Sequence, residues 1–225
     1  MTLTLYTAKD FINDSGYTTG KTGYKSFSLC PYYMCWMNVK YRCTSSTHIK
    51  NRPSYVGTSC VEGWLRFTNF KAWMEEQPYE GMHLDKDLIV AGNKLYGPET
   101  CCFVPIRLNS LLTNCTKKVN YGNTPLGVTR KKPAKWMVSE HSKPFAAQIS
   151  GYGSLKRFRG TFATMEEAHK VWQEAKANSI EETVSWWASD PSVNNSFNTR
   201  VADSLLNRVW KLRLDAALGI ETTEI

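Results

Sequence analysis

The sequence predicts an α+β fold: a first domain of helices and short strands, then a small three-stranded antiparallel sheet with one helix, then a C-terminal helix. Near the N-terminus, Tyr33, Trp36, Met37 and Tyr41 recur at three- and four-residue steps, which is the period of an amphipathic helix that lays aromatic residues into a core. Further along, residues 145–149 alternate between two faces, a glycine-containing turn follows, and residues 157–162 alternate again. That pattern is typical of a β-hairpin.

The elements of the first domain follow from the same periods. Aromatic residues repeat at helical steps over 64–74, which predicts a second amphipathic helix. Residues 83–90 and 101–104 are predicted to form two short strands, with a turn signal at 91–94 between them. Pro105 suits the first position of a helix, where its missing N–H would be unpaired in any case, and a leucine stripe follows it.

The second half of the chain is predicted to form a separate domain. The polar stretch 113–124 has no apolar period and is expected to be a linker. After the hairpin, Thr164 and Glu167 form a capping box, so a helix is expected to begin there and to cover the apolar side of the hairpin. A last helix is predicted over 199–218, ended by Gly219. The predicted segments are a first domain over 1–112, a linker over 113–124, a second domain over 125–187 and a helical tail over 188–225.

Composition limits the function. The chain has 225 residues, 42% of them hydrophobic and 21% charged, as expected of a folded protein. No stretch approaches the roughly 18 apolar residues of a membrane-spanning helix, and the N-terminus lacks the pattern of a signal peptide. We therefore expect a cytoplasmic protein without a membrane partner. Seven cysteines, an odd number, do not favour a complete disulfide framework, and a net charge of +8 favours a polyanionic partner.

Positive charge is concentrated in the second domain. Residues 127–160 hold eight basic side chains and one acidic side chain, which leaves a net charge of +7. Strand alternation divides the hairpin into a face with Phe145, Ala147, Ile149, Phe158 and Phe162 and a face with Gln148, Arg157, Arg159 and Thr161. If the helix covers the first face, the second is open to bind. The same charge would also suit a solvated basic face kept for solubility.

Two sets of motifs resemble known families. One set comprises Cys35–Met37 to Cys43, Val61–Phe70, Leu84–Asp87, Gly92–Tyr96, Pro98–Pro105 and Asn109. This set resembles the HNH endonucleases carried by bacteriophages, many of which behave as homing endonucleases. The other set comprises Gly127–Val128, Phe145–Ile149, Gly160–Phe162 and Glu166–Ala168, and it resembles the DNA-binding domain of plant ethylene-response factors. Phage HNH proteins often carry such a domain at their C-terminal end, so the two resemblances support each other.

The first resemblance implies a centre for phosphodiester hydrolysis, built on two strands and a helix around one divalent metal ion. It implies Asp85 and Asn109 as the metal ligands. A hard ion such as Mg²⁺ or Mn²⁺ suits one carboxylate and one amide oxygen. Asn93 and Thr100, where the family often has Asn, are interpreted as orienting groups or, equally, as ordinary turn and strand residues.

The general base is the position at which the chain departs from this family. Lys86 stands where the family has His, and the usual lysine pKa of about 10.4 leaves it protonated at pH 7. It would act as a base only if burial lowered that pKa, and as a cation it would instead hold the phosphate. His83 is predicted to share a strand face with Asp85 and Asp87 and is the alternative base.

The second resemblance implies double-stranded DNA as the partner. A sheet can enter the major groove, so we expect Gln148, Arg157 and Arg159 to read bases. Phosphate contacts are expected from Arg130, Lys131, Lys132, Lys143 and Lys156. The cysteines lack a paired Cys-x-x-Cys, which does not favour structural zinc.

Three function classes follow. The first is a metal-dependent DNA endonuclease, compatible with a monomer, in the cytoplasm of a bacterial host cell. The second is a DNA-binding protein whose nuclease fold is inactive. The third is a non-enzymatic protein whose basic face meets an acidic partner. The pairing of Asp85 with Asn109 favours the first class, Lys86 favours the second, and only the net charge favours the third.

Overall fold

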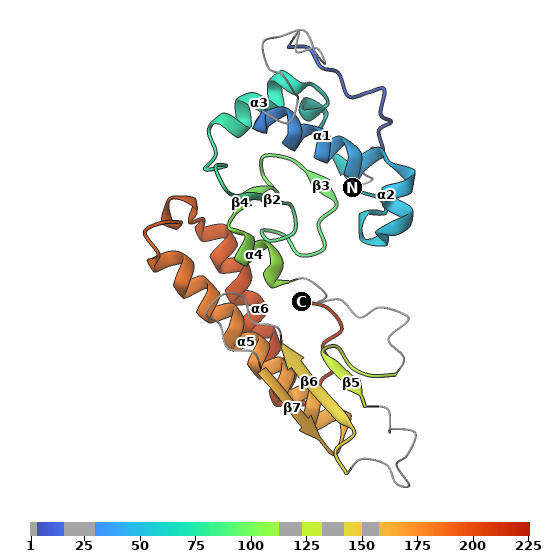
Figure 1. Cartoon of the computed structure of the whole chain (residues 1–225), viewed down its shortest axis with the longest axis vertical. Helices are drawn as coiled ribbons and strands as arrows, with labels where there is room; N and C mark the ends of the chain where they lie inside the picture. The colour runs from blue at the N-terminus through green and yellow to red at the C-terminus, as the bar shows by residue number, and fades with distance from the viewer. Residues whose placement is uncertain (1–3, 16–29, 113–122, 132–141, 150–157) are drawn as a thin grey trace. The chain divides into compact units, whose positions relative to one another are not determined.

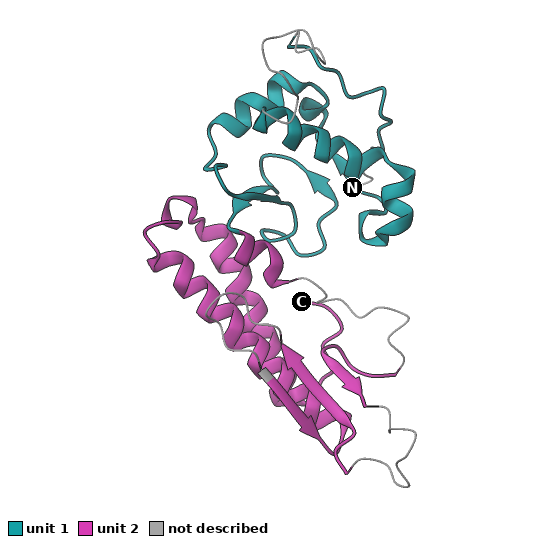
Figure 2. Cartoon of the chain, in the orientation of Figure 1, with its two compact units in different colours: residues 1–105 teal, residues 106–225 magenta. Residues whose placement is uncertain are grey.

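The protein mixes helices and strands, with 50% of its residues helical and 14% in strands in a computed structural model (Figure 1). The structure describes residues 4–15, 30–112, 123–131, 142–149 and 158–225. Packing divides the chain into two compact units, residues 1–105 and 106–225, which Figure 2 colours separately. The division falls in front of the helix that carries Asn109, whereas the sequence predicted a linker at 113–124. Most of that predicted linker lies outside the described residues.

The first unit is built from short helices and very short strands. Its helices are α1 (Pro31–Thr44), α2 (Ser46–Asn51) and α3 (Phe67–Glu75), with 3₁₀ turns at Pro53–Tyr55 and Glu62–Leu65. Its strands are β1 (Ser59–Cys60), β2 (His83–Asp85), β3 (Leu95–Tyr96) and β4 (Cys102–Val104). Strands β1 and β3 pair in parallel, and β2 and β4 pair antiparallel, with Asp85 opposite Cys102.

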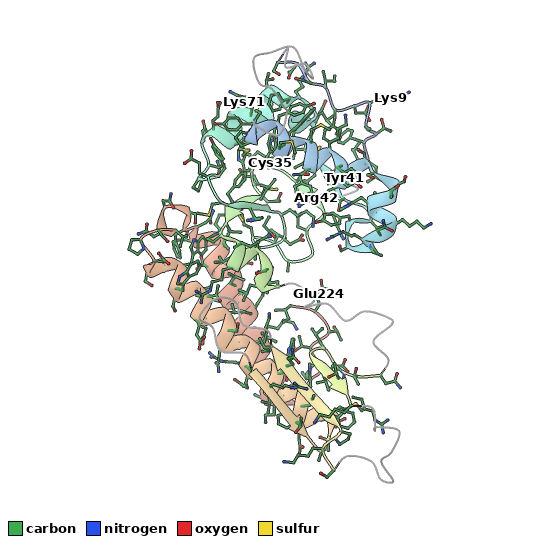
Figure 3. The ribbon with its side chains drawn as sticks, in the orientation of Figure 1. Lys9, Cys35, Tyr41, Arg42, Lys71 and Glu224 are labelled. Carbon is green, nitrogen blue, oxygen red and sulfur yellow. The ribbon has the colours of Figure 1, made fainter. Side chains whose placement is uncertain are left out.

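An aromatic core holds these short elements together. Trp36 and Phe67 are almost wholly buried, and the Trp36 indole N–H donates a hydrogen bond to the Trp64 carbonyl oxygen at 2.8 Å. Burial of each large apolar side chain contributes about 1.5–3 kcal/mol, so side-chain packing can stabilise strands that are too short to be stable alone. The helix predicted around Trp36 is confirmed as α1. Tyr41, on its last turn (Figure 3), is 49% exposed and does not belong to the core.

Local chain geometry changes two predicted elements of the first unit. The helix predicted over 64–74 begins only at Phe67, because Arg66 is extended and Trp64 lies in the preceding 3₁₀ turn. The strand predicted over 83–90 ends at Asp85, whose carboxylate accepts backbone N–H groups from the residues that follow and so turns the chain. Strands β1 and β3 hold two residues each, which is too few to show a period in the sequence.

The second unit combines an antiparallel sheet with two long helices. It opens with α4 (Ile106–Leu111), and β5 (Val128–Arg130), β6 (Phe145–Ile149) and β7 (Phe158–Phe162) then form a sheet in the order β5-β6-β7. Next come α5 (Met165–Ser189), a 3₁₀ turn at Asn194–Ser196 and α6 (Thr199–Leu218). The predicted three-stranded sheet with its helix and the C-terminal helix are confirmed.

Helix α5 lies against the sheet along its first half (Figure 1) and against α6 along its second half. Its predicted cap is present, because the Thr164 hydroxyl oxygen accepts the Glu167 backbone N–H at 3.2 Å. Trp172 packs against Gly127, whose φ is +77°, and a Cβ atom added to Gly127 would lie 2.1 Å from the Trp172 indole nitrogen. Among the helices in the described part of the chain, none is both long enough and apolar enough to span a bilayer.

The C-terminal segment is tied into the second unit by a buried polar network. The Thr222 backbone N–H donates to His169 Nε2 at 3.0 Å, and His169 Nδ1 lies 2.9 Å from the Leu126 carbonyl oxygen. Because Nε2 accepts, Nδ1 must donate, which fixes one neutral tautomer of the imidazole. The Thr222 hydroxyl donates to Asp215 at 2.6 Å. The residues predicted as a tail over 188–225 therefore pack within the same unit as the sheet.

Candidate functional site

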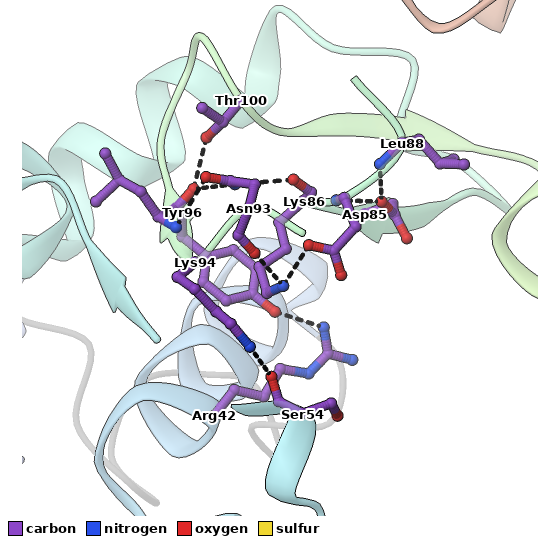
Figure 4. A network of polar contacts seen from close by, with 11 residues as sticks. Arg42, Ser54, Asp85, Lys86, Leu88, Asn93, Lys94, Tyr96 and Thr100 are labelled. Carbon is purple, nitrogen blue, oxygen red and sulfur yellow. Dashed lines mark hydrogen bonds and ion pairs between the residues drawn. The ribbon is translucent and has the colours of Figure 1, made fainter. Parts of the chain in front are cut away.

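The loop between β2 and β4, residues 86–101, is held by its own side chains (Figure 4). The Asn93 amide nitrogen donates to the carbonyl oxygens of Lys86 at 2.8 Å and Leu95 at 2.7 Å, and its amide oxygen accepts the Leu95 N–H at 3.1 Å. The Thr100 hydroxyl donates to the Leu95 carbonyl oxygen at 2.6 Å. Asn93 and Thr100 thus orient the loop backbone. The Asn93 amide nitrogen donates to two carbonyl oxygens of the loop, so it does not point to a substrate.

Asp85 ends strand β2 and begins this loop. Its Oδ1 accepts backbone N–H groups from Asp87 at 2.6 Å and from Leu88 at 2.8 Å. No residue that the structure describes hydrogen-bonds to the other oxygen, Oδ2. Burial raises the pKa of the Asp85 carboxyl above its usual value, although the two N–H groups and the charge of Lys86 oppose that shift. A half-buried carboxylate is therefore held rigidly, with one oxygen that a cation can bind.

Lys86 is buried, with 6% of its surface exposed. Its ammonium nitrogen donates to Asp87 at 2.5 Å and to the Asn93 carbonyl oxygen at 2.7 Å, and it lies 5.8 Å from the centre of the Tyr55 ring. These are the contacts of a charged ammonium that braces the loop. To act as a base or to hold a phosphate, Lys86 would have to break them.

His83 is exposed at the start of β2, opposite Val104. Residues two apart on a strand point to the same side, so His83 and Asp85 share one side of β2. The sequence placed Asp87 on that side as well. However, β2 ends at Asp85 and the chain turns there, so strand alternation does not place Asp87.

Asn109, the second predicted metal ligand, lies on α4 in the second unit, whereas Asp85 lies in the first. Helix α4 is anchored to α5. The Arg107 guanidinium lies 4.3 Å from the centre of the Trp186 ring, and the Lys176 ammonium donates to the Leu111 carbonyl oxygen at 2.5 Å. These contacts hold the backbone of Asn109, whose side chain is half-buried.

The described cysteines are buried or half-buried thiols. Burial raises the pKa of the Cys35 and Cys101 thiols to about 12, so both stay protonated at neutral pH. Within the described ranges, no three His, Cys, Asp or Glu side chains are gathered as metal ligands.

The sheet of the second unit leaves one face uncovered by α5. Gln148 on β6 lies directly opposite Arg159 on β7, and both side chains are exposed. Thr161 lies opposite Ala146 in the same register, which places it on the same face as Gln148 and Arg159. The predicted grouping of Gln148, Arg159 and Thr161 on one face therefore holds, whereas Arg157 lies outside the described residues.

The predicted phosphate contacts are spread over more than one face. Arg130 is exposed but lies opposite Phe145, so strand alternation puts it on the side of α5 and not with Gln148. Lys143 is exposed just before β6, and the Lys131 backbone N–H donates to the Pro144 carbonyl oxygen at 2.8 Å. Lys132 and Lys156 lie outside the described residues.

Sequence reasoning missed a second cluster in the first unit. The Arg42 guanidinium donates to the Tyr96 hydroxyl at 3.0 Å (Figure 4). It also lies 5.7 Å from the centre of the Tyr55 ring, the same ring that Lys86 approaches. These residues come from three distant parts of the chain, so no local spacing in the sequence predicted the cluster.

Comparison of the chain with protein-family models, with curated proteins and with solved structures gives no match.

Proposed function

We propose that the chain is a metal-dependent DNA endonuclease whose second unit selects the DNA site. The observation that carries the proposal is the Asp85 carboxylate, which is half-buried, fixed through Oδ1 by two backbone N–H groups, and left with Oδ2 for a ligand. A carboxylate whose burial opposes its ionisation costs folding stability. A bound cation offsets that cost, because it favours the ionised form.

In the proposed centre, Asp85 Oδ2 would hold a Mg²⁺ or Mn²⁺ ion. Such an ion supplies charge stabilisation to a scissile phosphate and its leaving oxygen. His83 shares the side of β2 on which Asp85 lies, and its imidazole would accept the proton of the attacking water. Asn93 and Thr100 hold the loop that follows Asp85, so they position the centre without touching the substrate.

Cleavage of duplex DNA in Mg²⁺, with mapping of the new ends, tests the proposal. Asp85→Asn keeps an oxygen that can accept both backbone N–H groups but removes the charge, so we expect the rate to fall about a thousandfold with an unchanged fold. Glu80→Gln is the matched control, because it removes one exposed carboxylate from the same unit. If Asp85→Asn cleaves DNA at the wild-type rate, Asp85 does not belong to the proposed centre.

A second candidate function is a DNA-binding protein with an inactive nuclease fold. It is favoured by Lys86, which stands where HNH enzymes have their base and is occupied by Asp87 and Asn93. The same assay separates the two functions. Salt-dependent DNA binding by a wild-type chain that cuts no DNA in Mg²⁺ or Mn²⁺ would support the second.

A further inference from the structure

The N-terminal part of the chain has a one-sided charge. Residues 15–61 contain six Lys and Arg side chains and no Asp or Glu. The basic residues in the described part of this segment are Lys40, Arg42, Lys50 and Arg52. None of the four lies within 4.0 Å of a carboxylate among the described residues, although salt bridges form elsewhere in the unit. A segment kept basic only for solubility would carry acids among its bases, as most surfaces do.

Three rings in mutual contact, those of Tyr41, His48 and Tyr55, fix the shape of this segment. The rings of Tyr41 and His48 are 4.9 Å apart, those of His48 and Tyr55 are also 4.9 Å apart, and both pairs are tilted. This ring cluster joins the end of α1 to α2 and to the 3₁₀ turn that follows. The Ser45 hydroxyl oxygen accepts the His48 N–H at 3.2 Å and caps α2. Lys50 and Arg52 therefore project from a fixed backbone, and both are exposed.

The charges beside this ring cluster make the local field positive. Arg42 lies 5.7 Å from the centre of the Tyr55 ring, and burial together with the charges of Arg52 and Arg42 lowers the pKa of His48. His48 Nε2 is buried and has no hydrogen-bond partner among the described residues. The cations are thus close enough to repel a third charge, and no described acid offsets them. We call the exposed residues here, Tyr41, Lys50 and Arg52, the basic face.

We propose that the basic face binds the phosphate backbone of duplex DNA, as a contact in the first unit separate from the sheet of the second. The inference rests on the proposed function for the identity of the polyanion. Duplex DNA carries closely spaced phosphates, which exposed Lys and Arg side chains neutralise with release of counterions. The half-exposed Tyr41 ring supplies a hydroxyl that can donate to a phosphate oxygen. Contacts of this kind position a protein on DNA without reading its sequence.

The test uses the full chain in EDTA, with a duplex of arbitrary sequence and a series of salt concentrations. Lys50→Ala with Arg52→Ala should lower the affinity about tenfold at 0.1 M salt and reduce the salt slope by about two. Lys9→Ala with Lys170→Ala removes two exposed charges elsewhere and is the matched control, for which we expect little change. Lys50→Arg with Arg52→Lys keeps both charges and should bind as the wild type does.

Equal losses in the paired variant and its control would overturn the basic face, because bulk charge would then explain both. An unchanged slope in the paired variant, with its melting temperature equal to that of the wild type, would overturn it as well. Cleavage is measured separately in Mg²⁺, so the two proposals can fail independently. If the wild-type chain cuts no DNA and the paired variant has a reduced salt slope, the basic face is supported and the nuclease proposal is rejected.

Discussion

The two candidate sites use their polar side chains in opposite ways. In the loop of the first unit, the side chains of Asn93 and Lys86 each donate to the other residue's backbone carbonyl oxygen, and Lys86 also donates to Asp87. On the uncovered face of the sheet, Gln148 and Arg159 are exposed opposite each other, and the core beneath them is formed by other residues. Function and stability are therefore coupled in the first site and separable in the second.

The largest effect should come from the packing beneath the sheet. Gly127→Ala forces a non-glycine residue to a φ of +77° and places its Cβ 2.1 Å from the Trp172 indole nitrogen, so α5 and the sheet must separate. We expect a loss of about 3 kcal/mol or more in the free energy of unfolding, measured by urea denaturation. Gly81→Ala is the control, because Gly81 has a φ of +71° and open space around it, and only the backbone cost of about 1 kcal/mol applies. Equal losses in the two variants would show that the Trp172 side chain moves to make room for the added Cβ atom.

The next effect should come from the loop of the first unit. Lys86→Met keeps the apolar stem but removes the ammonium that donates to Asp87 and to the Asn93 carbonyl oxygen. Since Asp87 remains half-exposed, we expect a loss of about 1–3 kcal/mol, below the value for a fully buried pair. His83→Ala, at an exposed strand position, should stay within about 0.5 kcal/mol and still slow cleavage at pH 7. A Lys86→Met variant as stable as His83→Ala would contradict the bracing role.

Asp85→Asn should change stability in a pH-dependent direction. Burial raises the folded-state pKa of the carboxyl above its unfolded value, so the stability that this group contributes is complete at low pH and is lost as pH rises through the folded pKa. The variant lacks this loss. In EDTA, the melting temperature of Asp85→Asn should therefore gain on the wild type between pH 4 and pH 7. If the melting temperature of the variant instead falls relative to the wild type as pH rises, the ionised carboxylate stabilises the fold.

The smallest effect on stability should come from the sheet face. Gln148→Ala and Arg159→Ala remove exposed side chains, so the free energy of unfolding should change by less than about 0.5 kcal/mol. Each should still cost about 1–3 kcal/mol of binding at particular base pairs, measured on a panel of duplexes. Lys143→Ala, beside the same strand, should weaken binding to every duplex alike. If the two variants lose stability and keep the wild-type base preference, the sheet face has a structural role.

Regular patterns made much of the second unit predictable. The alternation of Gln148, Arg159 and Thr161, the Thr164 cap and the Gly219 helix end are local signals, and each has a direct counterpart in the structure. The sequence predicted no end for this helix, because the second half of α5 is stabilised by packing against α6, the next helix along the chain.

The first unit was harder to predict because its order comes from contacts between distant residues. Strand β3 exists through its pairing with β1 and through the Asn93 and Thr100 side chains. The resemblance singled out Asp85 as a ligand, yet nothing in the sequence showed that one of its oxygens would also turn the chain. Similarly, a lysine in the place of a histidine gives no sign that its charge is matched by the next residue, Asp87.

Helix α5 has a consequence for how the second unit opens. Its 25 residues serve the sheet at one end and α6 at the other, and Gln173 near its middle also donates to the carbonyl oxygen of Ile220 in the C-terminal segment. Releasing the sheet, α6 or the C-terminal segment therefore exposes part of one shared helix. In hydrogen-exchange experiments, amides near the centre of α5 should exchange only when the whole unit unfolds, as members of a single cooperative unit.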